Sequence, residues 1–292
     1  MSVSLPSMVP EIMALARELG CPEEVLAPLE LAAENLTDSL PLEKLACPQT
    51  AGNAWEEISA RIPGFSEDDG MAQLAVTMGA AVLTRKKYAD LGISQQVFLD
   101  TMLCIPRFLR ETKDLLGRSA YDRGFWTWRQ TGCLLFRLGT LEFEFRYLCD
   151  GEPLTRDLVP GDPVLDIHIP SDARISPDSL GDSYRRARAF FKGETQGPWC
   201  SHAPKAILCA SWLLAETLQK LLPETSGIRI FAADYEIFSR CEDSDSFYRW
   251  LYQLPRPVPF RELPERTGLQ RALKAHLLSG GHMGMAHGIL KI

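Results

Sequence analysis

The sequence predicts an α+β chain in which an all-helical N-terminal domain, residues 1–120, precedes a mixed-sheet α/β domain, residues 121–292. Three observations predict this fold class. Apolar residues recur at helical spacing through the first 118 positions, apolar and polar residues alternate after Gly117, and candidate strands and helices then follow one another to the C-terminus. A chain of 292 residues is long enough for two domains with their own cores.

Helix start and stop signals divide the first 120 residues. Gly20 and Gly117 stand where helical patterns end, and glycine suits the left-handed residue that follows a helix. Ser66 and Ser94 stand where patterns begin and predict N-caps, while Pro106 predicts a break. The predicted helices cover residues 10–19, 23–35 and 54–61, the stretch after Ser66, and residues 94–116.

Strand patterns begin after Gly117. Residues 141–147 alternate between apolar and polar side chains, which is the period of a half-buried strand. Ser176 and Pro177 predict a helix start, with serine as the N-cap and proline at the first helical position. The other predicted strands are 134–138, 164–169, 206–212, 228–238 and 283–292, and further helices are predicted at 213–222, 246–254 and 267–278.

Charge and cysteine content exclude several classes of protein. The net charge is −7, and residues 1–120 carry 17 acidic against 10 basic side chains. An acidic chain without a basic tract argues against nucleic acid or an anionic membrane as a partner. The eight cysteines form no Cys-x-x-Cys pair and no metal-ligand spacing, so no metal is expected. The start lacks a signal-peptide pattern, and reduced thiols then predict a cytoplasmic protein.

Three segments of the second half carry a resemblance to a known family. They are residues 135–143, 165–170 and 209–214, and the tail from Thr267 with its glycines at 280, 281, 284 and 288 fits as well. In these segments the chain resembles bacterial acyltransferase-domain proteins, which pair a helical N-acyltransferase N-terminal domain with a GNAT-like C-terminal domain. The resemblance implies acyl transfer from acyl-coenzyme A (acyl-CoA), as cosubstrate, to an amine or similar small acceptor.

The resemblance also implies where the thioester enters. In GNAT folds the fourth and fifth strands separate and the thioester arm passes between them, and here those strands are residues 164–169 and 206–212. Asp166 and His168 share one face of the first of them, because side chains alternate along a strand. A histidine beside a carboxylate suits general-base catalysis, which is useful because the attacking amine must lose a proton. The alternative is a structural histidine hydrogen-bonded within the sheet.

The turn after this strand matches the pyrophosphate loop of the family by position. The predicted cofactor-binding residues are Ile169, Ser171, Arg174, Ser176 and Arg186, because backbone N–H groups at a helix start and arginine side chains suit phosphate. The turn departs from the family pattern because it contains no glycine. The alternative is an ordinary capped helix start followed by a solvated basic face.

Cys209 and Ser211 share a face of the strand at 206–212. Either side chain is a candidate for lining the thioester channel or donating to the carbonyl oxyanion, and an acyl-cysteine route is a further catalytic option. The alternative for Cys209 is simple packing. Tyr235, Tyr184 and Tyr248 are the candidates for returning a proton to the leaving thiolate, and their spacing does not choose among them.

Two functions from different classes stay open at this point. One is an enzyme, a GNAT-like N-acyltransferase that works by direct transfer in a ternary complex. The other is a non-catalytic GNAT-like protein that binds a ligand or a partner, which the glycine-free turn favours. The sequence does not specify the acyl chain, the acceptor, the choice between acyl-CoA and acyl carrier protein as donor, the role of the helical domain or the oligomeric state.

Overall fold

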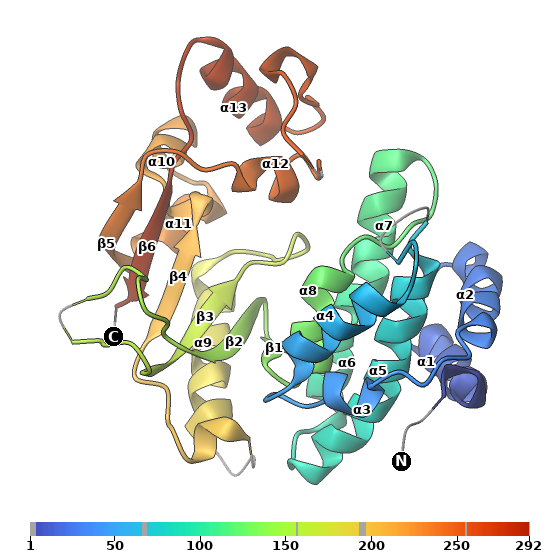
Figure 1. Cartoon of the computed structure of the whole chain (residues 1–292). Coiled ribbons are helices and arrows are strands. Elements are labelled where there is room, and N and C mark those ends of the chain that lie inside the picture. The colour runs from blue at the N-terminus through green and yellow to red at the C-terminus, as the bar shows by residue number, and fades with distance from the viewer. Residues whose placement is uncertain (1–3, 66–68, 156, 193–196, 255, 292) are drawn as a thin grey trace. The chain divides into compact units, whose positions relative to one another are not determined.

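The computed structural model describes residues 4–65, 69–155, 157–192, 197–254 and 256–291 (Figure 1). The chain divides into two compact units. The first contains Met1–Leu138 and Glu194–Cys200, and the second contains Gly139–Gly193 and Ser201–Ile292. Helices dominate the first unit and a mixed sheet dominates the second, which confirms the predicted fold class.

The first unit is built around a long helix that is buried on most sides. α5 (Met71–Asp90) has buried apolar residues around most of its circumference, among them Leu74 and Met78. A Cβ atom on Gly79 would lie 2.5 Å from Leu5 Cδ2, so the close packing at this point favours glycine. The other described elements of this unit are η1 (Leu5–Met8), α1 (Val9–Glu18), α2 (Glu23–Asn35), α3 (Leu42–Leu45), α4 (Ala51–Arg61), α6 (Gln95–Met102), α7 (Cys104–Leu116), α8 (Gly124–Thr131), β1 (Leu135–Leu138) and η2 (Pro198–Cys200).

The predicted helix ends are confirmed where the structure describes them. Gly20 and Gly117 follow α1 and α7 with φ angles of 71° and 70°, in the left-handed region. The Ser94 hydroxyl accepts a hydrogen bond from the Val97 N–H at 3.3 Å and caps α6. These contacts satisfy backbone groups that a helix end otherwise leaves without partners.

Two details of the helix boundaries differ from the sequence prediction. The break predicted at Pro106 falls at Leu103, so that Pro106 lies in the first turn of α7, where a missing N–H is tolerated. α5 begins at Met71 after Gly70, and Ser66, its predicted N-cap, lies outside the described residues.

The second unit contains most of the sheet, whose strand order is β1-β2-β3-β4-β6-β5. β3 and β4 are parallel, while β2–β3, β4–β6 and β5–β6 are antiparallel, so the sheet is mixed. The described elements of this unit are β2 (Leu141–Tyr147), β3 (Pro163–His168), α9 (Pro177–Lys192), β4 (Ile207–Ser211), η3 (Trp212–Leu214), α10 (Glu216–Leu221), α11 (Gly227–Ala233), β5 (Tyr235–Cys241), α12 (Ser246–Trp250), η4 (Phe260–Glu262), α13 (Gly268–Leu278) and β6 (Met285–Leu290).

Helix α9 covers one face of the sheet. Its apolar side is buried, and Phe191 stacks on Phe145 of β2 with ring centroids 6.5 Å apart. The Ser176 hydroxyl accepts a hydrogen bond from the Ser179 N–H at 3.2 Å, which confirms the predicted N-cap. A parallel pair needs a long crossover connection, and α9 lies in the crossover between β3 and β4.

The strand predicted at residues 228–238 was wrong over its first half. Residues Gly227–Ala233 form helix α11, and only Tyr235–Cys241 form the strand β5. Isoleucine and phenylalanine favour strands by composition, but Ile228 and Phe231 are three residues apart and therefore share one side of a helix. Phe231 is buried with its ring 4.8 Å from that of Tyr235, so packing overrides the local preference.

We predict that the start of α13 contributes measurably to stability. Thr267 and Gln270 form a capping box, and the Gln270 amide also donates to the Leu251 carbonyl at 3.0 Å. Thr267→Ala should lower the free energy of unfolding by about 1 kcal/mol, and Gln270→Ala by about 2 kcal/mol because it removes more hydrogen bonds. Urea denaturation measures both. Glu262→Ala, at an exposed ion pair, is the control and should cost less than about 0.5 kcal/mol.

Candidate functional site

The two strands that were predicted to separate are paired only through the middle of β3 and the beginning of β4. The Leu165 N–H donates to the Ala206 carbonyl at 3.0 Å, and the register then pairs Leu165 with Ile207 and Asp166 with Leu208. Among the described residues no β3–β4 pair follows, although β3 stays paired with β2 as far as His168 and β4 with β6 as far as Ser211. The end of this ladder agrees with the predicted separation.

One face of the sheet carries polar residues around the end of the ladder. Register places Glu144 beside Asp166, Asp166 beside Leu208, and Ala210 beside His287, and residues opposite one another share a face. We call this side the open face; it is formed by Glu142, Glu144, Arg146, Asp166, His168, Leu208, Ala210 and His287.

Only part of the open face is covered by other residues. Leu148 and Leu158, from the connection between β2 and β3, pack on Val164 and Leu208 in a buried apolar cluster. One step further along β4, Ala210 is exposed although it lies in a central strand. The face is therefore covered by apolar side chains at Leu208 and exposed at Ala210, next to the end of the ladder.

His168 is held by a carboxylate from the neighbouring strand. Its Nε2 lies 2.8 Å from Glu144 Oε2, and both side chains are largely buried. With Nε2–H donated to an ionised Glu144, the basic nitrogen of the neutral ring is Nδ1. Glu144 was not among the site residues predicted from the sequence, although its place in the alternating strand 141–147 is the signal that could have found it.

Asp166 has a different partner from the one its place beside His168 suggested. Arg146 Nε lies 2.5 Å from Asp166 Oδ2, and the same guanidinium makes two contacts of 2.8 Å with the carboxylate of Glu152. Burial raises the pKa of Asp166, although the Arg146 contact opposes this, and Asp166 Oδ1 is buried with no hydrogen-bond partner. Burial alone would lower the pKa of Arg146, but its two carboxylate partners raise it overall, so the arginine stays charged. This network forms the border between the covered and the open parts of the face.

Cys209 and Ser211 lie on the other face of the sheet, because they alternate with Leu208 and Ala210. Cys209 is fully buried, and burial raises the pKa of its thiol, so the reactive thiolate is disfavoured at neutral pH. The Ser211 hydroxyl accepts a hydrogen bond from the Leu213 N–H at 3.1 Å and caps η3. Both residues therefore have structural roles, and their catalytic roles stay predictions.

The three candidate tyrosines lie on α9, at the start of β5 and on α12 of the second unit. Tyr184 donates a hydrogen bond to Asp234 Oδ2 at 3.0 Å, Tyr235 is buried at the start of β5, and Tyr248 donates to the Val258 carbonyl at 3.3 Å. Burial raises the pKa of each of these phenols. A raised pKa keeps a phenol protonated, which suits a proton donor but does not choose among the three.

The predicted phosphate-binding residues follow β3 directly, except for Arg186. Ile169 and Ser171 lie in the turn, and Ser176 caps α9. Arg174 is exposed, and its carbonyl accepts hydrogen bonds from the Thr140 and Ser179 hydroxyls. Arg186 lies further along α9, and its Nε contacts Asp182 Oδ2 at 2.5 Å. The turn and helix start are adjacent as predicted, whereas the Arg186 guanidinium is already paired.

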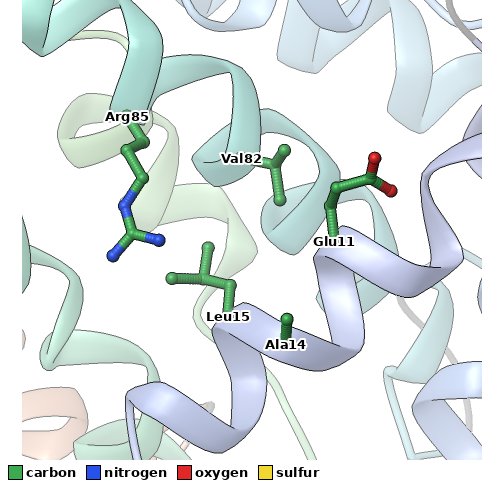
Figure 2. Close-up of a pocket in the computed structure, with 5 residues that line it drawn as sticks. All are labelled: Glu11, Ala14, Leu15, Val82 and Arg85. Carbon is green, nitrogen blue, oxygen red and sulfur yellow. The ribbon is translucent and has the colours of Figure 1, made fainter.

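The structure reveals no other obvious ligand site among the described residues. No group of three or more metal-ligating side chains occurs in them, and none of their helices has the length and apolar character needed to cross a bilayer. A small cavity of about 210 Å³ lies in the first unit, between α1 and α5 (Figure 2). Ala14, Leu15 and Val82 line it between Glu11 and Arg85, and Arg85 is paired with Glu18 at 2.6 Å. It contains none of the predicted site residues and is smaller than typical ligand pockets.

Comparison with known proteins agrees with this architecture. Residues 135–290 match the family model of the GNAT-like C-terminal domain, and residues 10–133 match that of the N-acyltransferase N-terminal domain. The chain belongs to the GNAT-like C-terminal domain family. The family resemblance drawn from the sequence is thereby confirmed, including the helical N-acyltransferase domain that precedes the GNAT-like one.

Solved structures of acyltransferases share the fold of this GNAT-like protein. An acyltransferase mutant in complex with octanoyl-CoA is 23% identical with a TM-score of 0.73, over 97% of this chain and 88% of the other. An acyltransferase in complex with decanoyl-CoA and teicoplanin is 22% identical with a TM-score of 0.66, over 98% and 99% of the two chains. No protein with a curated functional description matches the chain. At these identities the likeness establishes the fold.

We predict that Arg146 is essential to the stability of the second unit. Arg146→Met leaves Asp166 and Glu152 without their shared cation, and should lower the free energy of unfolding by about 3 kcal/mol at pH 7. Burial raises the pKa of Glu152, but its hydrogen bonds and the charge of Arg146 lower it more, so the net shift is downward. The stabilisation that Glu152 contributes is therefore present at neutral pH and is lost as pH falls through this lowered pKa. The loss in free energy of unfolding that Arg146→Met causes should therefore become smaller below about pH 4.

Urea denaturation at pH 7 and at about pH 3 tests this expectation. Arg185→Met is the matched control, because Arg185 is an exposed helix arginine paired with Asp182 and should contribute less than about 0.5 kcal/mol. An equal loss for both variants at pH 7 would contradict the role given to Arg146.

We also predict that the Cys209 thiol is unreactive in the folded protein. The exposed thiols of Cys149, Cys200 and Cys241 should react with a disulfide reagent such as dithionitrobenzoate within minutes, whereas Cys209 should react only after unfolding. Peptide mapping by mass spectrometry distinguishes the sites. Rapid native labelling of Cys209 would show that its strand face is accessible.

Proposed function

We propose that this protein is an acyltransferase that moves an acyl group from acyl-CoA to a primary amine by direct transfer. The observation that carries the proposal is the end of the β3–β4 ladder beside the His168–Glu144 pair. Family membership and the shared fold of acyltransferases crystallised with acyl-CoA support it. The donor arm would enter where the strands stop pairing, and His168 would stand next to the reacting carbonyl.

The strand backbone provides a way to bind and polarise the thioester. The backbone groups of Ala206 and Leu208 face β3, so those of Ala210 face the same side by alternation. Ala210 lies beyond the last β3–β4 pair in the described ladder, and its N–H can therefore donate to a ligand carbonyl. Such a preorganised donor stabilises the negative charge that develops on the carbonyl oxygen during attack.

The proposed reaction is a single displacement at the thioester carbon. The amine nitrogen forms a bond to this carbon, the carbon–sulfur bond breaks, and the sulfur leaves with its electron pair as the CoA thiolate. His168 takes the proton that the amine must lose, and Glu144 stabilises the imidazolium that forms. Holding amine and thioester together supplies a large part of the acceleration. The buried Cys209 is not needed in this route, and Asp166 serves through Arg146 to fix the border of the site.

The turn after β3 is the proposed place for the CoA phosphates. Backbone N–H groups at the start of α9 and the exposed guanidinium of Arg174 favour an anion there. Arg186 would contribute by its charge while it stays paired with Asp182. We further propose a cytoplasmic, two-domain protein, because acyl-CoA is an intracellular donor and the eight cysteines are free thiols.

The alternative function is a GNAT-like protein that binds a ligand without catalysis. The glycine-free turn and the prior pairing of Arg186 favour this alternative. It predicts binding of acyl-CoA, or of another ligand, without release of a thiol.

One experiment separates the two functions. The full chain is mixed with octanoyl-CoA or decanoyl-CoA, and free thiol is measured with benzylamine, tyramine, spermidine or teicoplanin as the acceptor. Melting temperature is measured with each thioester, with CoA and with adenosine diphosphate. Stabilisation together with amine-dependent thiol release supports the enzyme, because a ligand at 100 times its Kd adds about 2.7 kcal/mol. Stabilisation without release with any amine supports the binding protein.

We predict that His168→Ala lowers kcat by about a hundredfold or more while octanoyl-CoA still raises the melting temperature, because the general base is lost and the binding strand is kept. Glu144→Gln should lower kcat by about tenfold, since it removes the charge that stabilises the imidazolium. His282→Ala, at an exposed histidine, is the control. Unchanged turnover in His168→Ala would remove this residue from the mechanism.

A further inference from the structure

The open face holds a second histidine that the proposed reaction does not use. His287 lies on β6 directly opposite Ala210. On the same face, His168 is the next residue of β3 after Asp166, and Ala210 is the next residue of β4 after Leu208, the last pair of the ladder. His168, Ala210 and His287 thus lie on one face of three neighbouring strands where β3 and β4 stop pairing, and the exposed Ala210 leaves this part of the face open.

The two histidines have different surroundings. His168 has Glu144 at 2.8 Å, whereas within the described residues the imidazole of His287 makes no hydrogen bond and no ion pair. Its ring lies beside Phe238, with centroids 6.1 Å apart. A half-buried imidazole without a protein partner, on an open part of the face, retains its hydrogen-bonding capacity for a ligand.

The charges around His287 leave its ring neutral near pH 7. Burial lowers its pKa, and this outweighs Asp166 and Glu152, which raise it, while Arg146 lowers it further. On the same face β4 contributes the uncharged Leu208 and Ala210, and β3 contributes His168 besides Asp166. On β5, Ser239 lies opposite His287 and Glu236 opposite Ile289, two residues further along. A neutral ring keeps one nitrogen with a lone pair.

We propose that His287 binds the acceptor: its imidazole accepts a hydrogen bond from the amine that is to be acylated. This inference rests on the acyl transfer proposed above and gives the two histidines separate tasks. His168, held by Glu144, takes the proton, and His287 holds the nitrogen before attack. The neighbouring Phe238 ring favours an amine that carries an aromatic or other apolar group.

Steady-state kinetics of the full chain test the proposal, with octanoyl-CoA and the panel amine that releases thiol fastest, which we expect to be benzylamine. At pH 7.5, His287→Ala should raise KM for the amine about fivefold to tenfold, the value of one hydrogen bond, with kcat within about twofold. His287→Gln keeps an acceptor and should restore KM to within about twofold. The affinity for octanoyl-CoA should not change in either variant.

The pH dependence separates a binding role from a structural one. As pH falls through the lowered pKa of His287, the wild-type ring gains a proton and loses its lone pair, so the KM ratio between His287→Ala and wild type should approach one. Protonation of the free amine affects both proteins equally and cancels in this ratio. His287→Gln cannot titrate and should become better than wild type at low pH. His282→Ala is the control for loss of a histidine elsewhere.

Three results would overturn the inference. Thiol release with an unchanged KM in His287→Ala removes His287 from acceptor binding and leaves the acyl transfer standing. A similar fall in melting temperature and octanoyl-CoA affinity in both His287 variants means that the histidine is structural. No thiol release with any amine of the panel overturns the acyl transfer and this inference together.

Discussion

The short ladder between β3 and β4 is the constraint on which the candidate site depends. Both strands are held extended by their outer neighbours, β3 by β2 and β4 by β6, while their mutual pairing stops at Asp166 and Leu208. Backbone N–H and C=O groups that leave a ladder need other partners. A sheet can sustain such an edge in its middle only where water or a ligand reaches it, and the exposed Ala210 lies at this point. The place of the opening thus follows from strand pairing rather than from a loop.

Ion pairs on the open face hold in place the residues that border the opening between β3 and β4. Arg146 satisfies two carboxylates at once, Asp166 on β3 and Glu152 in the connection after β2. Ionised groups at this depth are tolerated only when paired, and the pairing ties that connection to the central strands. The apolar cluster that includes Val164 and Leu208 closes the face on one side of this network. On the other side the histidines stay within reach of solvent and ligand.

Local sequence patterns predicted the strand residues of the site but not their partners. Alternation placed Asp166 and His168 on one face correctly, yet the carboxylate that holds His168 is Glu144, and Asp166 is bound to Arg146. These pairs depend on the register between β2 and β3, which no pattern within one strand specifies. His287 and His168 are also far apart in the sequence, so only the strand pairing shows that they share one face of the sheet.

The sequence by itself determined the helical first half, the caps at Ser94 and Ser176, the glycine helix ends and most strands of the mixed sheet. Periodicity and capping act over a few residues, so they can be recognised without knowledge of the rest of the chain. The tertiary structure alone decided that residues 227–233 are helical, where the parallel ladder ends, and which side chains meet on the open face. Those outcomes depend on packing and register summed over distant segments, and one strand shifted by one residue would turn every side chain to the opposite face.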